Sequence, residues 1–218
     1  NFAANTYALK SHGATQLLSF AAVGSLRENR APGDLVVPSQ FIDRSKGIRR
    51  SSFSGGGIVA HVSLADPVWS QGVEWLRKKA PLYSFRSHFD KTGVIIEGPY
   101  FSTRAESHHY RAIGADIVGM TAFPEFALAR EAGLAYLPAS FVTDFDSWNT
   151  QIEHVTIAEV IRVMRENNAK AFQILGDVLE SPLVRDEATR DSGLKTGLMT
   201  PLEALSQERR LVFETLLR

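Results

Sequence analysis

Strand-like apolar runs alternate with helical segments along almost the whole chain, and this alternation constrains the fold more than any other feature. The strand-like runs cover residues 17–23, 34–38, 58–62, 92–97, 115–118 and 134–142. Predicted helices lie between most of these runs and at both ends of the chain. Such alternation is typical of α/β proteins. Because the 218 residues contain no repeat and no linker, we expect one α/β domain over residues 1–218, with a central mixed β-sheet flanked by helices.

Several predicted helices have recognisable start signals. Asp66 as the N-cap and Pro67 at the first helical position predict a helix that runs to about residue 79. Thr103 and Glu106 form a capping box, in which each side chain can bond the backbone N–H of the other residue. These signals fix where two of the helices are expected to begin.

Three further helices are predicted downstream. One begins at Pro124 and ends at Gly133. A second capping box, Thr156 with Glu159, opens a long amphipathic helix, and Pro201 starts the last helix. The apolar face of the long helix carries Ile157, Val160, Ile161, Met164 and Phe172.

The first ten residues also have helical spacing, with Ala4, Tyr7, Ala8 and Leu9 as their apolar positions. The chain has no initiator Met and no targeting pattern at this end. Since a sheet domain rarely begins in the middle of a helix, we expect that preceding sequence is absent.

Charge and cysteine content narrow the classes of function. The chain has 24 basic and 24 acidic residues and a formal net charge of zero, which argues against electrostatic capture of nucleic acid or of an acidic membrane. No apolar stretch approaches the roughly 20 residues that span a bilayer. We therefore expect neither a nucleic-acid partner nor a membrane partner. The absence of cysteine excludes disulfides and thiolate metal sites, and we expect a cytoplasmic location.

Common metal and cofactor motifs do not occur in the sequence. His108 and His109 are adjacent, so they point to different faces of a helix and are expected at the surface. There is no Gly-x-Gly-x-x-Gly after a strand, no Walker loop and no Gly-x-Ser-x-Gly elbow. We expect no metal and no cofactor. Residues 44–57 form a long basic loop rich in Ser and Gly, and such loops are often functional.

Two carboxylates, Asp144 and Asp146, follow directly after the apolar run of residues 134–142. In open α/β sheets, ligands bind at the carboxyl ends of the strands. A carboxylate accepts hydrogen bonds from an exocyclic amine, and a protonated carboxyl can also donate to a ring nitrogen. The pair could therefore read the amino edge of a purine. The alternative is an Asp-rich turn with solvated side chains.

A series of motifs resembles the 5'-methylthioadenosine phosphorylase branch of the purine nucleoside phosphorylase family. They run in order over almost the whole chain: residues 22–28 (AVGSLRE), 32–34 (PGD), 40–44 (QFIDR), 61–67 (HVSLADP), 97–107 (EGPYFSTRAES), 119–121 (GMT), 124–125 (PE), 129–133 (AREAG) and 143–148 (TDFDSW). The resemblance implies a nucleoside phosphorylase-like fold and phosphorolysis of 5'-methylthioadenosine to adenine and 5-methylthioribose 1-phosphate. Inorganic phosphate would be the co-substrate, and other purine nucleoside phosphorylases are the alternative.

The resemblance also implies a role for the acid pair. Asp144 would protonate or hydrogen-bond N7 of the departing purine, and Asp146 would reinforce it and favour a 6-amino group. Burial and like-charge proximity both help to keep one carboxyl protonated. Relatives that prefer 6-oxopurines carry Asn where Asp144 stands, so the pair points to adenine.

Other site residues follow from the resemblance alone. For the base and ribose, Phe101 would stack on the purine, Ser102 and Thr143 would lie at its edge, and Met120 would lie against the ribose. Phosphate would be bound by the Thr121 hydroxyl and by the backbone at Ala21 and Ala22. Ala21 stands where relatives often carry a hydroxyl or amide, so one phosphate contact is expected to be missing.

The 5' end of the nucleoside would be bound by apolar residues and by a neighbouring subunit. Ile157, Val160 and Ile161 would surround the methylthio group, and His61 of an adjacent subunit in a homotrimer would close the pocket. Phe101 and the three aliphatic residues could equally be plain core.

The chain departs from the family pattern at its front. Family members begin with a strand and a Gly-Thr-Gly phosphate loop, followed by an Arg-His pair that also binds phosphate, and this sequence has neither. Three explanations stay open. The chain is a shortened form, or a separate amino-terminal chain supplies the front, or the protein binds nucleosides without turnover.

Overall fold

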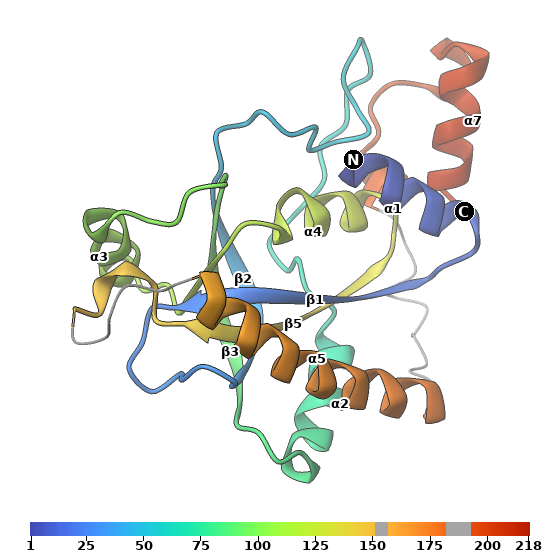
Figure 1. Ribbon diagram of the computed structural model, residues 1–218. Coiled ribbons are helices and arrows are strands. Elements are labelled where there is room, and N and C mark those ends of the chain that lie inside the picture. Colours follow the sequence, from blue (N-terminus) through green and yellow to red (C-terminus); the bar gives the residue numbers. More distant parts are fainter. Residues whose placement is uncertain (151–156, 182–192) are drawn as a thin grey trace.

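The fold is built around five β-strands that the computed structural model describes within residues 1–150, 157–181 and 193–218. They are β1 (Gln16–Ser25), β2 (Leu35–Arg44), β3 (Ser87–Ile96), β4 (Ile117–Gly119) and β5 (Ala135–Asp144). The strands follow the order β1-β4-β3-β2-β5, and β5 pairs with β1, so the sheet closes into a barrel. Parallel and antiparallel pairs both occur. The predicted mixed sheet is confirmed (Figure 1). Its closure into a barrel was not predicted from the sequence.

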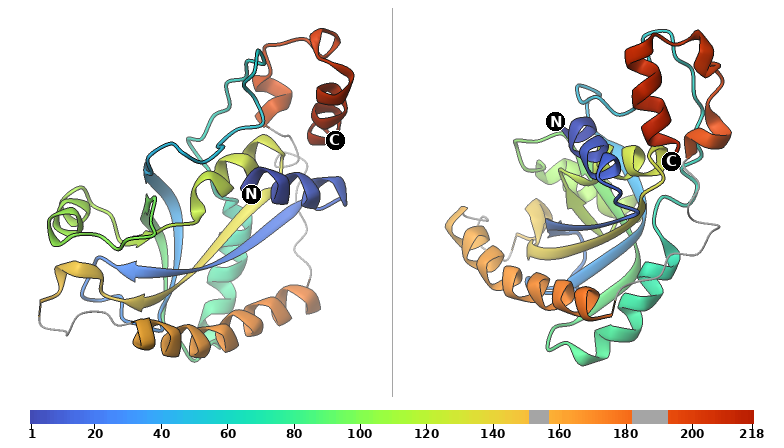
Figure 2. Two further views of the ribbon diagram at one scale, coloured as in Figure 1. Left: turned by 45° about the horizontal axis from the view of Figure 1, so that its top comes forward. Right: turned by 90° about the vertical axis from the view of Figure 1, so that its right-hand side faces the viewer.

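Helices cover the barrel from two sides, as Figures 1 and 2 show. The helices are α1 (Phe2–Ser11), α2 (Ser70–Lys79), α3 (Arg104–Ala112), α4 (Ala122–Glu131), α5 (Ile157–Glu180), α6 (Gly193–Gly197) and α7 (Gln207–Leu216). Ala3 of α1, Leu128 of α4, Leu194 of α6 and Phe213 of α7 share one hydrophobic core. On the other side, α2 and α5 pack on the barrel in a second core. The predicted α/β arrangement with flanking helices is confirmed.

Strand β5 is the centre of the molecule. Its residues are buried from Ala135 to Thr143, and only Asp144 at its carboxyl end is partly exposed. Tyr136 faces the core under α1 and α4, whereas Ala135 and Leu137 face the core under α2 and α5. A strand covered on both faces has to be apolar throughout, which explains the uninterrupted run in the sequence.

The capping box at the start of α3 is formed as predicted. The Thr103 hydroxyl accepts from the Glu106 backbone N–H at 3.2 Å, and the Glu106 carboxylate accepts from the Thr103 N–H at 2.7 Å. Such a cap contributes about 1 kcal/mol to helix stability. His108 and His109 are exposed on this helix, as expected.

Two predicted elements are wrong in detail. Helix α2 begins at Ser70, not at Asp66, because Trp69 is held in extended conformation: it is 5% exposed and its N–H donates to Tyr136 O at 2.8 Å. Residues 58–62 do not form a strand of the sheet. There, Ala60 forms only an isolated bridge with Leu198, so the segment pairs with the chain after α6.

The last two predicted helices also differ from their sequence patterns. Helix α7 begins after Ser206, which caps it, and a short 3₁₀ turn at Leu202–Ala204 follows Pro201. Thr156 and the side chain of Glu159 lie outside the described residues. The face of α5 that meets the barrel carries Val163, Asn167 and Ile174, which are buried.

The predicted apolar face of α5 therefore does not pack on the barrel. Four of its members are exposed: Ile157 (73%), Ile161 (45%), Met164 (40%) and Phe172 (70%). None of the described helices is both long and apolar enough to cross a membrane.

Candidate active site

A cavity of about 360 Å³ lies at the carboxyl end of β5. Segments that are far apart in the sequence meet there: the second half of β1, the end of β3, the loop before α3, the end of β4 and the start of α5. Of the residues predicted from the resemblance, the cavity is lined by Ala21, Ala22, Phe101, Ser102, Met120, Thr121, Thr143, Asp144, Asp146 and Val160. The alternative that Phe101 is plain core is wrong, since Phe101 is 56% exposed.

Asp144 and Asp146 are linked to each other at the floor of this cavity. The Asp146 backbone N–H donates to Asp144 Oδ1 at 2.8 Å, and the Thr143 hydroxyl donates to Asp144 Oδ2 at 2.8 Å. Burial raises the pKa of the Asp144 carboxyl above its ordinary value, and these two hydrogen bonds offset part of the rise. A carboxyl in this setting can hold a proton more readily than one in water.

Asp146 is buried as well, with 8% of its surface exposed. Burial raises the pKa of its carboxyl, the nearby hydroxyls of Ser107 and Ser102 offset part of the rise, and the charge of Asp144 adds to it. Neither hydroxyl forms a hydrogen bond of normal geometry: Ser102 Oγ, Ser107 Oγ and Asp146 Oδ2 are among the buried atoms of the described residues that have no hydrogen-bond partner. Unpaired buried polar atoms are rare in proteins. Ser102 and Asp146 line the cavity, so their unpaired atoms are well suited to bind a ligand. The alternative of a solvated Asp-rich turn is wrong.

The turn that carries Asp146 is held in place on three sides. Asp146 has a φ of 48°, which a non-glycine residue adopts only when its surroundings enforce it. Ser147 Oγ donates to Ser102 O at 2.6 Å, and Trp148 Nε1 donates to Ser25 O at 2.8 Å. The Arg111 guanidinium lies 3.8 Å from the centre of the Trp148 ring. These contacts preorganise the second carboxylate.

Gly24 allows β1 to approach the acid pair closely. The register between β1 and β5 shifts at Val23 and Gly24, and Gly24 pairs with Asp144. A Cβ at Gly24 would lie 3.1 Å from Asp144 Oδ1 and 3.3 Å from Asp146 Cβ. The sequence offered Gly24 only as part of a motif; its packing role becomes visible in three dimensions.

The turn between β4 and α4 also lines the cavity, through Met120 and Thr121. Phe123 has an extended backbone conformation (φ −105°, ψ 133°), so the regular part of α4 begins at Pro124, where the sequence predicted it. The Thr121 hydroxyl makes no capping hydrogen bond. It can therefore donate to a ligand in the cavity, such as a phosphate oxygen.

Several lining residues were not predicted as site residues: Phe20, Val23, Gly24, Ile96, Val118, Gly119 and Met164. Met164 lies one helical turn after Val160, so helical spacing gave a signal for it. The strand residues could not be found without knowing which strands are neighbours.

Three predicted site residues are not brought to the cavity. Ile157 and Ile161 are exposed on α5. His61 is also exposed, and its backbone N–H donates to Gly197 O at 2.8 Å. Their roles stay predictions, as does the neighbouring subunit that His61 was expected to serve.

Comparison with known proteins places the chain in a family. Residues 1–180 match the profile of the Phosphorylase superfamily. An S-methyl-5'-thioadenosine phosphorylase of Coprinopsis cinerea is 43% identical over 218 residues, which cover 97% of this chain and 67% of the relative. Another from Thermofilum pendens is 48% identical over 181 residues, covering 83% of this chain and 68% of the relative.

Solved structures agree with these relatives. A methylthioadenosine phosphorylase from an Antarctic soil metagenomic library has a TM-score of 0.87 and 41% identity, covering 100% of this chain and 77% of that one. Methylthioadenosine phosphorylase from Schistosoma mansoni in complex with adenine has a TM-score of 0.84 and 34% identity, covering 91% and 77%. This chain therefore belongs to the phosphorylase superfamily, and within it to the S-methyl-5'-thioadenosine phosphorylases.

Proposed function

We propose that this protein is a pentosyltransferase that catalyses the phosphorolysis of 5'-methylthioadenosine, giving adenine and 5-methylthioribose 1-phosphate. The observation that carries the proposal is the buried pair of carboxyl groups, Asp144 and Asp146, in a cavity that is also lined by Thr121. The carboxyl groups suit a purine with an exocyclic amine, and the Thr121 hydroxyl suits an anion.

The reaction needs two kinds of charge stabilisation. A phosphate oxygen forms a bond to C1' of the ribose while the bond from C1' to N9 breaks, and its electron pair moves into the purine. In this proposal Asp144 transfers a proton to N7 as that charge develops, which avoids an anionic leaving group. Asp146 accepts a hydrogen bond from the 6-amino group through its unpaired Oδ2.

The remaining residues position the substrates. Phe101 stacks on the base, Met120 packs against the ribose, and Val160 with Met164 contacts the methylthio group. Thr121 and the backbone at Ala21 and Ala22 bind phosphate. Phosphate is a co-substrate in this scheme, and no other cofactor takes part. Holding phosphate and nucleoside together accounts for a large part of the rate, since oriented reactants react as if at very high concentration.

Phosphate-dependent release of adenine tests the proposal. The purified protein is incubated with 5'-methylthioadenosine, with and without inorganic phosphate, and adenine is followed by chromatography. We expect release only when phosphate is present, and much less hypoxanthine from inosine under the same conditions. Binding of 5'-methylthioadenosine without release in either condition would identify a nucleoside-binding protein and overturn the enzymatic proposal.

A further inference from the structure

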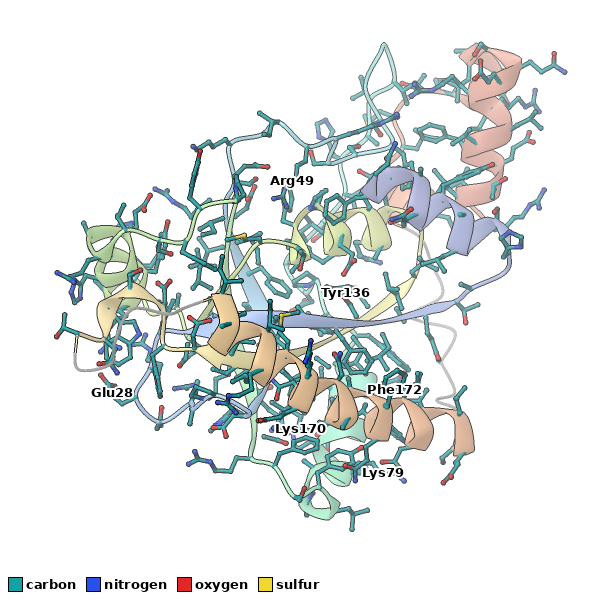
Figure 3. All side chains as sticks on the ribbon, viewed as in Figure 1. Glu28, Arg49, Lys79, Tyr136, Lys170 and Phe172 are labelled. Atoms are coloured by element: carbon teal, nitrogen blue, oxygen red, sulfur yellow. The ribbon has the colours of Figure 1, made fainter. Side chains whose placement is uncertain are left out.

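The side chain of Arg49 attaches the long basic loop after β2 to the cavity wall. Arg49, on this loop, donates through Nη1 to the carbonyl oxygen of Met120 and, at 2.9 Å, to that of Phe123. Met120 lies in the turn between β4 and α4, and Phe123 is the extended residue near the start of α4. Figure 3 shows Arg49 beside the start of that helix. One guanidinium thus spans the turn that carries Thr121.

The other side of the same guanidinium is fixed to the end of β3. Arg49 Nε forms an ion pair with Glu97 Oε1 at 2.8 Å, and Nη2 donates to the Glu97 carbonyl. The two side chains are 17% and 9% exposed, so the pair is shielded from solvent. A planar, five-donor guanidinium is the one side chain that can make all these contacts at once.

These contacts set the direction of the peptide that joins Met120 to Thr121. A peptide is planar and trans, so its N–H points away from its C=O. Because Arg49 holds the Met120 carbonyl, the Thr121 N–H points to the opposite side. Arg49 is not among the residues that line the cavity, whereas Met120 and Thr121 both are. The positive charge behind the carbonyl also polarises this amide, which strengthens its N–H as a donor to an anion.

We propose that Arg49 is a positioning residue for the phosphate subsite, acting through the Met120–Thr121 peptide without touching substrate. This inference rests on the proposed phosphorolysis, because it assigns phosphate to the wall that contains Thr121. It gives the loop of residues 45–57 a function: the loop brings a guanidinium behind the anion-binding turn. A residue that only stabilised the fold would affect both substrates alike.

The loop offers a matched control. Arg50 is the next residue, and its guanidinium bonds only carbonyls of the loop itself in the contacts described, those of Ser52 at 3.1 Å and Phe53 at 3.5 Å. Arg49→Gln and Arg50→Gln remove the same charge from adjacent positions. Arg49→Lys keeps the charge but cannot bridge two carbonyls and Glu97 together.

The test measures KM for phosphate and for 5'-methylthioadenosine, together with the Kd of inorganic phosphate by titration calorimetry. For Arg49→Gln we expect KM and Kd for phosphate to rise by about tenfold or more, since a displacement of about 1 Å can cost up to 10²-fold. KM for the nucleoside should change by less than about twofold, which is well below the roughly tenfold change expected for phosphate. Arg49→Lys should lie between wild type and Arg49→Gln, and Arg50→Gln should match wild type.

Three results would overturn the inference: an equal loss for both substrates, an unchanged phosphate affinity in Arg49→Gln, or a wild-type protein that does not bind phosphate. The proposed function fails separately, if wild type binds phosphate and nucleoside but releases no adenine. In that case the ratio of phosphate Kd values still decides the role of Arg49.

Discussion

At the scale of single residues, the two carboxyl groups share one motif but differ in their surroundings. Both oxygens of Asp144 accept hydrogen bonds within the protein, whereas Asp146 has an unpaired oxygen. Burial raises the pKa of both carboxyls. Pairs of titratable groups in different environments are typical of sites that divide proton transfer from recognition.

Replacing Asp144 with Asn tests this division of roles. The Asn amide can keep the existing contacts, since its oxygen can accept from the Asp146 N–H and its NH₂ can face the Thr143 hydroxyl. It cannot transfer a proton to N7. We therefore expect kcat/KM for 5'-methylthioadenosine to fall by about 10²-fold or more. Activity on inosine should fall less or rise, because selectivity is a difference of two affinities. An unchanged ratio between the two substrates would mean that Asp144 does not read the purine.

The pH dependence of stability shows whether the loss of activity in Asp144→Asn is catalytic or comes from unfolding. The raised pKa of Asp144 means that the folded state binds the proton more tightly than the unfolded chain. The free energy of unfolding therefore falls as pH rises from about 4, the ordinary Asp value, through the folded pKa. Asn has no such titration. We expect Asp144→Asn to melt at the same temperature as wild type or higher at pH 7, with the difference shrinking near pH 4.

At the scale of elements, the sequence predicted what local patterns determine. Strand β5 and the capping box of α3 were found because their signals lie within a few residues. The start of α2 was misplaced because the Trp69 backbone N–H donates to the carbonyl of Tyr136, which is distant in the sequence. Helical spacing predicted a face of α5 that includes Phe172 as the packed one, and this was wrong: Val163 and Ile174 are buried, whereas Phe172 is 70% exposed.

In the site, too, residues were predictable where the signal is local and not where it depends on contacts between distant segments. The two carboxyl groups of the site lie at and just after the end of one strand, so their place was predictable, and the resemblance supplied most of the other lining residues. Phe20 and Ile96 come from strands that meet only through the closed sheet. The clamp of Arg49 on Met120 and Phe123 joins residues more than seventy positions apart, and no local pattern predicts it.

Helix α5 provides an element-scale prediction. Val160 lines the cavity, whereas Ile161 is 45% exposed and does not. In the proposed binding mode, Val160→Asp places a carboxylate against the methylthio group, and burying an unpaired charge is costly. We expect the Kd for 5'-methylthioadenosine to rise at least about tenfold, which corresponds to 1.4 kcal/mol, with little change for adenine. Ile161→Asp is the matched control and should bind both ligands like wild type. Equal weakening of both ligands by Val160→Asp, with a lowered Tm, would indicate general destabilisation.

At the scale of the whole molecule, two surface features are largely exposed in the part of the chain that the structure describes. The apolar side chains of Ile157, Phe172 and Leu179 on α5 are 70% exposed or more. His61 is exposed and away from the cavity of its own chain. A closed ring of three subunits, which the resemblance implies, would bring surfaces of one chain to the site of the next. Light scattering should then give three times the 24.1 kDa of the chain, and a protein that is only monomeric at micromolar concentration would contradict the ring.

Mixed trimers test whether His61 completes a neighbour's site. His61→Ala should raise KM for 5'-methylthioadenosine, while Asp144→Asn removes proton transfer, so each variant alone is impaired at every site. In a mixed ring, a His61→Ala subunit keeps its own Asp144 and can receive an intact His61 from an Asp144→Asn neighbour. Random assortment of equal amounts around a closed ring makes about a quarter of the sites whole. Co-refolded mixtures should therefore be more active than the mean of the two parents, and activity equal to that mean would show that each chain uses its own His61 or none.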